Sequence, residues 1–198
     1  MTDAAGRPGE PGPAGVGVSQ LGPDWVEGPD GVPSRRGARL ILLDAEDRVL
    51  MVRGHDVDDP GRSWWFTVGG GIEPGEAAVD AAVRELAEEA GLVVPAADVA
   101  GPVATRRAVF DFARRSVRQD EEFFLARIAE PGPLVTRGWT DVERAFMDEV
   151  RWWDLDALER VAVTVYPEGF VPLVRDLLDG WDGILRRLPD EGVGPRKG

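Results

Sequence analysis

Apolar and polar residues recur with two different periods along the chain, and each period predicts one kind of element. Short runs rich in β-branched and aromatic residues predict strands at 39–44, 49–53, 64–68, 103–112, 117–128 and 150–153. The period becomes helical from Glu76 to Ala90 and again over 169–179, where Pro172 fits only in the first turn. Strands on both sides of one helix, with a second helix late in the chain, indicate an α/β fold in which a mixed sheet lies between helices.

The segments between these runs carry turn residues that predict how the strands connect. Residues 45–48 (Ala-Glu-Asp-Arg) separate the first two strands and predict a hairpin, and a second hairpin is expected to turn at 113–116. Residues 54–63 include Pro60, Gly61 and three aspartates, and this composition predicts a loop.

The two ends of the chain differ in composition from its centre. Residues 1–34 are rich in Gly, Pro, Ala and acidic side chains and lack periodicity, so they have too little apolar surface to offset the entropy lost on ordering. The same interpretation applies to 188–198. We therefore expect one folded domain over 35–187, with flexible tails at 1–34 and 188–198.

Composition narrows the classes of function that this domain can serve. The chain has no cysteine, which excludes disulfides and thiolate zinc sites, and no apolar run of the roughly 18 residues that a membrane span needs. Since a signal-peptide pattern is also missing, we expect a cytoplasmic protein without a membrane partner. The net charge of −13 and the single lysine, Lys197, argue against binding of nucleic acid polymers. A phosphorylated substrate would need arginine or a metal ion to neutralise it.

Three glutamates occupy one flank of the helix predicted at 76–90. They are Glu85, Glu88 and Glu89, spaced i, i+3 and i+4. The apolar face beside them consists of Val79, Ala82, Val83, Leu86 and Ala90. Like charges at this spacing cost roughly 0.2–0.5 kcal/mol per pair. A solvated helix face can carry such a cluster, but a cation would relieve the repulsion, and Mg²⁺ prefers carboxylate oxygens.

A wider pattern decides between a solvated face and a metal site. It reads Gly70, five residues, Glu76, seven residues, and then Arg-Glu-Leu-Ala-Glu-Glu-Ala-Gly-Leu over 84–92. Chance agreement at all of these positions is on the order of one in a million per chain. The stretch Gly70–Leu92 matches the Nudix box at every defining position, and the chain therefore resembles the Nudix hydrolases.

The resemblance extends beyond the box. Residues 65–71 are similar to the strand and glycine loop that precede the box in the family, although Val68 stands where many members have proline. The Arg-Trp-Trp at 151–153 and the Asp-Leu-Asp-Ala-Leu after it are similar to a late strand and short helix of bacterial members. This resemblance implies the Nudix fold, an α/β/α sandwich with a mixed β-sheet in which the box forms a loop–helix–loop.

The resemblance also implies a catalytic group within the box. Glu85, Glu88 and Glu89 match the metal-binding glutamates, and in some members the residue at Glu85 serves as the general base instead. Arg84 matches the arginine that holds these carboxylates in place. Glu76 matches an acid that supports that arrangement or binds metal from the side.

Substrate binding is expected from the glycines and from an arginine outside the box. Gly70 and Gly71 match positions where the backbone passes close to the metal and the diphosphate. Arginine can bind phosphate with two parallel hydrogen bonds. Arg106 and Arg107 are the better candidates for that role, and we predict Arg107.

A further metal ligand is expected on the strand predicted at 117–128. Glu121 and Glu122 lie where many family members place an additional metal-binding or basic glutamate. Only one of two successive residues on a strand can point inward, and we predict that it is Glu122. The alternative is that one of the two acids is solvated and the other lies at the rim. The single histidine, His55, is expected to be incidental.

Together these residues predict metal-assisted hydrolysis of a phosphate–phosphate linkage. Mg²⁺, with Mn²⁺ as a substitute, would neutralise the diphosphate, and a nucleoside monophosphate would be released. The expected substrate is a small nucleotide derivative, such as a nucleoside triphosphate or a nucleotide sugar, because the motifs of the NADH, ADP-ribose, dinucleoside polyphosphate and coenzyme A subgroups are missing. The alternative is a catalytically silent Nudix-fold module that binds a ligand and has a regulatory role. A homodimer is compatible with either function.

Overall fold

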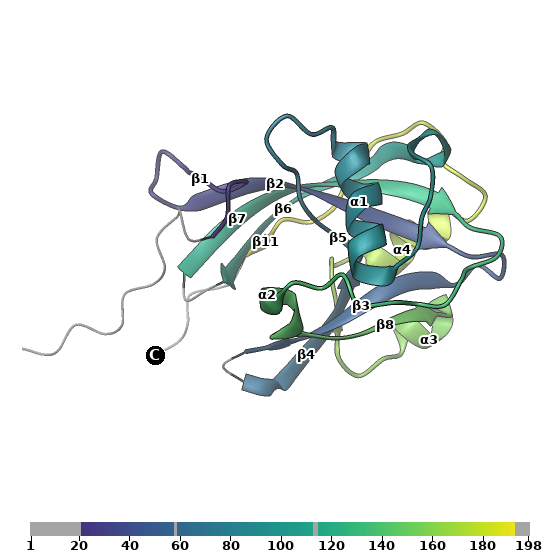
Figure 1. The fold of residues 1–198 in the computed structure, drawn as a ribbon. Helices are drawn as coiled ribbons and strands as arrows, with labels where there is room; N and C mark the ends of the chain where they lie inside the picture. The colour runs from purple at the N-terminus through teal and green to yellow at the C-terminus, as the bar shows by residue number, and fades with distance from the viewer. Residues whose placement is uncertain (1–20, 58, 113–114, 193–198) are drawn as a thin grey trace, which may run out of the picture.

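A mixed β-sheet runs through the part of the chain that the computed structural model describes, residues 21–57, 59–112 and 115–192 (Figure 1). Its strands are β1 (Val26–Glu27), β2 (Pro33–Leu43), β3 (Val49–Asp56), β4 (Asp59–Thr67), β5 (Gly69–Gly71), β6 (Ala100–Phe112), β7 (Arg115–Arg127), β8 (Met147–Trp153), β9 (Thr164–Val165), β10 (Arg186–Arg187) and β11 (Glu191–Gly192). The α-helices are α1 (Ala78–Ala90), α2 (Asp141–Arg144), α3 (Leu155–Glu159) and α4 (Phe170–Asp176). Among these described helices, none is long and apolar enough to cross a membrane.

The sheet combines parallel and antiparallel pairing in the order β10-β6-β7-β2-β3-β4-β9. β6 and β7 form the second predicted hairpin, whose turn residues 113–114 lie outside the described residues. β7 then runs parallel to β2, from Ser34 opposite Arg118 to Leu43 opposite Arg127. A parallel pair needs a long crossover connection, and α1 lies within that connection.

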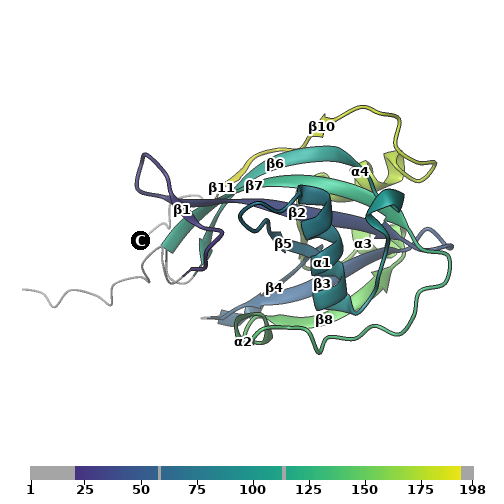
Figure 2. The same ribbon diagram turned by 45° about the horizontal axis from the view of Figure 1, so that its top comes forward.

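β2 and β3 separate almost as soon as their turn ends. Within the described sheet, the two strands are paired at Leu43 and Val49 alone. β2 then pairs with β5 and β7, whereas β3 pairs with β4 and β8. The hairpin predicted from 39–44 and 49–53 is therefore correct at its turn and wrong along its length. Figure 2 shows α1 between the part of the sheet that contains β2 and the part that contains β3.

Alternating residues of the central strands feed two hydrophobic cores, one on each face of the sheet. Leu40 of β2 belongs to the core that includes Leu86 of α1. Its neighbour Ile41 points the other way, into the core that includes Leu173 of α4. This alternation follows from the two-residue period of a strand. Helices cover both faces, so the predicted α/β/α sandwich with a mixed sheet is confirmed.

The segment predicted as a loop at 54–63 is instead a continuation of two strands. β3 reaches Asp56 and β4 begins at Asp59, with His55 opposite Ser63. Pro60 and Gly61 lie next to the hairpin tip, where the loss of a ladder hydrogen bond costs little. The turn-like composition therefore marks the end of a long hairpin.

The described fold extends past both predicted domain limits. β1 pairs with the start of β2, and the side chain of Trp25 is 5% exposed. At the other end Leu188 is buried and β11 pairs with β6. Trp25 and Leu188 are apolar side chains of these Gly- and Pro-rich segments that are buried, so residues 21–34 and 188–192 form part of the described fold. The other residues of the predicted tails, 1–20 and 193–198, lie outside the described residues.

Candidate active site

Helix α1 carries the box residues and turns two of its glutamates inward. It begins at Ala78, two residues later than predicted, and ends where Gly91 adopts a left-handed conformation with φ of 70°. Its buried residues are Ala81, Ala82, Glu85, Leu86, Glu89 and Ala90. Val79 and Val83, expected on the apolar face, are only partly buried. The buried face of α1 is therefore turned from the predicted apolar face, so that it includes Glu85 and Glu89.

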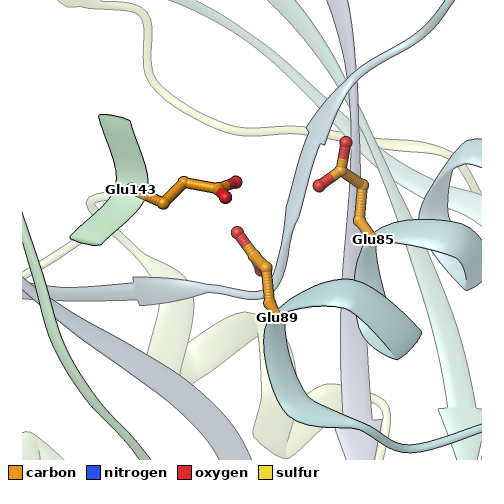
Figure 3. A group of neighbouring side chains, drawn as sticks. All are labelled: Glu85, Glu89 and Glu143. Carbon is orange, nitrogen blue, oxygen red and sulfur yellow. The ribbon is translucent and has the colours of Figure 1, made fainter. Parts of the chain in front are cut away.

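Glu85 and Glu89 meet a third acid from a different helix. Glu143 of α2 points toward both of them, as Figure 3 shows. One carboxylate oxygen from each of the three residues lies within 4.8 Å of the other two. We call Glu85, Glu89 and Glu143 the acid group.

The acid group holds negative charge in a place that disfavours it. Burial, followed by the nearby carboxylate of Glu85, raises the pKa of Glu89 well above its ordinary value. Burial likewise raises the pKa of Glu85, although Arg84 opposes that shift. A divalent cation would compensate both effects, and clustered carboxylate oxygens are the ligands that Mg²⁺ prefers. The acid group therefore fits the metal ion expected from the sequence.

Arg84 joins the acid group to its surroundings. Its Nε and Nη2 donate to the two carboxylate oxygens of Glu76, at 2.8 and 3.0 Å. Its Nη1 donates to Glu85 at 2.9 Å and to Glu88 at 3.0 Å, and Nη2 also reaches the carbonyl of Gly71 at 3.0 Å. The hydrogen bonds that Arg84 donates to Glu76 outweigh partial burial and raise the pKa of Arg84. This arrangement suits the holding role that the sequence assigned to Arg84, with Glu76 in support.

Strand β5 brings the backbone next to the acid group. A Cβ at Gly70 would lie 2.4 Å from Oε1 of Glu85, which is far shorter than van der Waals contact, so only glycine fits there. The N–H of Gly69 donates to Oε2 of Glu89 at 2.9 Å. The glycine loop therefore both fixes Glu89 and leaves room beside Glu85.

Glu88 lies on the outer flank of α1. Its side chain is 50% exposed and pairs with Arg84. Successive helix residues are about 100° apart, so Glu88 cannot share the inward direction of Glu89. Among the described acids, the cluster with metal-ligand spacing contains Glu143 rather than Glu88.

The side chains of Glu121 and Glu122 on β7 point in the opposite directions to those predicted: Glu121 is the buried one. Glu121 is buried, with Oε1 accepting from Arg39 at 2.8 Å and Oε2 accepting from Arg106 at 2.6 Å. Glu122 is only partly buried and pairs with Arg36. The inward residue is therefore Glu121, because two arginines compensate its charge there. Glu122 is not in the acid group, so the structure does not support it as a metal ligand.

The predicted phosphate-binding arginine lies on the surface of the β6–β7 hairpin. Arg107 pairs with Asp120 at 2.7 Å, and both side chains are 54% exposed. Its neighbour Arg106 is mostly buried between Glu121 and Glu191. Neither arginine is paired with the acid group among the described residues, and the phosphate-binding role of Arg107 stays a prediction.

Glu143 was missed by the sequence reasoning. It follows Thr140 by three residues, and this spacing is the signature of a capping box at a helix start. The structure contains that box, with the N–H of Thr140 donating to Oε2 of Glu143 at 2.7 Å. The signal thus predicts a cap and gives no hint that the same carboxylate faces Glu85 and Glu89.

The family model for the NUDIX domain matches residues 33–174. This span covers most of the sheet, α1 and the acid group. The chain therefore belongs to the Nudix family, as the box predicted.

Two proteins of Bacillus subtilis (strain 168) are similar over shorter stretches. One, named "Putative 8-oxo-dGTP diphosphatase", is 41% identical over 56 residues, which are 28% of this chain and 34% of the relative. The other, named "Uncharacterized Nudix hydrolase YvcI", is 36% identical over 53 residues, 27% of this chain and 30% of the relative. The matches thus span about a third of each relative, at 34% and 30%.

Solved structures share the fold at low sequence identity. The NUDIX domain of Shewanella oneidensis NrtR, titled as a complex with ADP ribose, aligns with a TM-score of 0.50 at 18% identity, covering 71% of this chain and 86% of that one. A MutT protein from Bacillus halodurans aligns with a TM-score of 0.49 at 22% identity, covering 71% and 79%. These likenesses concern the fold and do not extend to a substrate.

Proposed function

We propose that the protein is a metal-dependent pyrophosphohydrolase that cleaves the diphosphate linkage of a small nucleotide derivative and releases a nucleoside monophosphate. The observation that carries this proposal is the acid group, Glu85, Glu89 and Glu143, held beside an intact Nudix box. Three carboxylates within 4.8 Å of one another are costly without a cation. A module that binds a ligand without catalysis would have no need for this destabilising cluster of carboxylates.

In this proposal Glu85 and Glu89 hold Mg²⁺, with Mn²⁺ as a substitute, and Glu143 lies beside the ion. The ion, when bound, neutralises the diphosphate oxygens and promotes attack by water. Glu89 is fixed by the N–H of Gly69 and Glu85 by Arg84, so these two residues form the rigid part of the site. Glu88 lies close enough to Arg84 to support the same arrangement from the outer flank.

Glu143 is proposed as the residue that takes the proton from the attacking water. It comes from α2 rather than from the box helix, and it is the least buried member of the acid group. A proton acceptor must reach water as well as the reacting phosphorus, and partial exposure meets that need. Glu85, the other residue with this role in the family, is held by Arg84 and faces the metal site.

The substrate class follows from charge and from the relatives. A net charge of −13 disfavours long anionic polymers and leaves small nucleotides, whose charge a bound ion neutralises locally. One relative is named "Putative 8-oxo-dGTP diphosphatase", and one structural neighbour was solved as a complex with ADP ribose. We therefore propose a nucleoside triphosphate, a nucleotide sugar or a similar nucleoside diphosphate derivative.

A panel of compounds tests this proposal. It comprises canonical and oxidised nucleoside triphosphates, nucleotide sugars, ADP-ribose, dinucleoside polyphosphates, NADH and coenzyme A, each with Mg²⁺ or Mn²⁺. We expect release of a nucleoside monophosphate from at least one of the first two groups, measured by chromatography. A kcat/KM for NADH or coenzyme A at least about tenfold above all other compounds would contradict the substrate class. Binding without any turnover would instead indicate the silent module.

A further inference from the structure

A small cavity lies beside Glu85. Its volume is about 160 Å³, and its lining includes Asp24, Arg35, Gly71, Glu73, Arg84 and Glu85. Sites that enclose a whole small molecule usually measure roughly 300–1,000 Å³, so this cavity suits only part of a ligand. Its walls come from the segment before β1, from β2, from β5, from the stretch between β5 and α1, and from α1 itself.

Arg35 is held firmly on the wall of this cavity. Its Nη1 donates to Oδ2 of Asp24 at 2.8 Å, and its Nε donates to Oε1 of Gln119 at 2.7 Å. The ring of Trp25 lies 4.5 Å from its Cζ, in cation–π contact. Three neighbours therefore fix the plane of the guanidinium next to Glu85.

The two arginines of the cavity differ in how many of their guanidinium N–H groups already donate a hydrogen bond. Arg84 is bonded to three carboxylates, those of Glu76, Glu85 and Glu88. Arg35 has one carboxylate partner, Asp24, and its hydrogen bonds to described residues use two of the five guanidinium N–H groups. Arg35 is thus the cation of this cavity that still has donors for a ligand.

The cavity also has the shape and charge for an anion once a metal is bound. A Cβ at Gly71 would lie 2.0 Å from Oδ2 of Asp24 and 3.0 Å from Nη1 of Arg35, so the glycine lets the Asp24–Arg35 pair lie against the backbone of β5. A divalent ion on Glu85 would change the formal charge of the cavity lining from −1 to +1, and a fixed guanidinium matches phosphate geometry. We propose that Arg35 binds a phosphate oxygen of the substrate in this cavity, next to the metal. The proposal rests on the proposed function.

Substitution of Arg35 tests this role. Arg35→Gln should raise KM for the preferred compound about tenfold or more, because a charge-assisted hydrogen bond is lost, while kcat changes less. Arg35→Lys keeps the charge without the planar fork and should give an intermediate KM. Calorimetric titration with inorganic pyrophosphate and Mg²⁺ should show the same order of Kd.

Two further variants separate this role from a structural one. Arg36→Gln makes the same change at the neighbouring residue of β2, whose exposed side chain pairs with Glu122, and should leave KM and Kd within about twofold. The double variant Asp24→Asn/Arg35→Gln removes both partners of the ion pair, so no unpaired carboxylate remains to unfold the protein. KM and Kd values within twofold of wild type in this folded double variant overturn the proposal. If the wild type hydrolyses nothing, the proposed function fails, and the pyrophosphate titration still decides on Arg35.

Discussion

Individual residues of the site are placed where they cost stability. Glu85 and Glu89 are both buried on one face of α1, one turn apart, and burial raises the pKa of each. On an exposed helix the same pair would cost only a few tenths of a kcal/mol. When the pair is buried, the repulsion costs more, and a cation bound at the proposed metal site would relieve it.

Glu121 shows the opposite solution to the same problem. Burial alone would raise its pKa, but Arg39 and Arg106 outweigh that effect and lower it. Arg39 also donates to the carbonyl of Gly69, whose N–H holds Glu89. Glu121 is therefore a buried anion that supports the glycine loop without belonging to the acid group.

Glu121→Gln should destabilise the protein by about 3–5 kcal/mol at pH 7, because two arginines lose their shared partner. The sign of the pH dependence follows from the lowered pKa of Glu121. Its contribution is fully present above the ordinary carboxyl pKa and is lost as pH falls through the lowered value. Urea unfolding of the metal-free protein at several pH values should therefore show the variant approaching wild type in acid.

Glu122→Gln is the matched control for this measurement. Glu122 is the next residue of β7 and has one partner, the exposed Arg36. Its loss should cost less than about 1 kcal/mol. Equal destabilisation by the two substitutions would show that the buried network around Glu121 contributes no more to stability than the exposed pair of Glu122 and Arg36.

At the scale of elements, the segment before β2 departs most from the sequence prediction. Its Gly- and Pro-rich composition predicts a dispensable tail up to residue 34. In the structure Trp25 is buried, and Asp24 and Trp25 both contact Arg35. A composition average over the segment conceals one large aromatic residue, and that residue decides the packing.

Truncation separates the two parts of this segment. Residues 1–20 are rich in Gly, Pro and Ala and lack periodicity, so their removal should leave melting temperature and turnover unchanged. Removal of residues 1–27 also takes away Trp25 and should destabilise by roughly 3–5 kcal/mol, the usual cost of deleting a buried aromatic side chain. Thermal unfolding and KM of both truncated proteins provide the measurement. Indistinguishable behaviour of the two would restore the view of a dispensable tail.

Elements with strong local signals could be predicted from the sequence, whereas their contacts could not. The periodicity over 76–90 and Gly91 gave α1 to within two residues. Turn residues misled at 54–63, because Pro60 and Gly61 also fit the tip of a long hairpin. The exposure of Arg107 could not be predicted for a related reason, since a period of two gives the faces of a strand without saying what covers each face.

At the scale of the whole molecule, the site depends on pairings between distant segments. β2 pairs in parallel with β7, about 80 residues later in the chain, and separates from β3, its neighbour in sequence. α1 and β5 lie in the space that this separation creates (Figure 2). No local pattern encodes that divergence, which is why Glu143 was missed and Glu122 was preferred over Glu121. The box could be predicted because its residues are close in sequence and its Glu85, Glu88 and Glu89 sit on one helix, α1.

The net charge of −13 belongs to this scale as well. Many of the acidic side chains pair with arginines, such as Glu76 with Arg84 and Glu121 with Arg39, and the net charge is the acidic excess that remains. In the acid group a bound metal ion would supply further positive charge. We therefore propose that the hydrolase activity depends on a divalent ion bound by Glu85 and Glu89, beside Glu143.

The most direct test measures turnover of the preferred compound by wild type and Glu89→Gln, each with saturating Mg²⁺ and with chelator. Asp80→Asn, the same kind of change on the exposed face of α1, is the control. We expect turnover only with metal, a loss of at least about a hundredfold in Glu89→Gln, and a metal-free melting temperature in that variant at or above that of wild type, because a buried charge is removed. Turnover of the wild type in chelator, or wild-type turnover by Glu89→Gln at saturating Mg²⁺, would contradict the account.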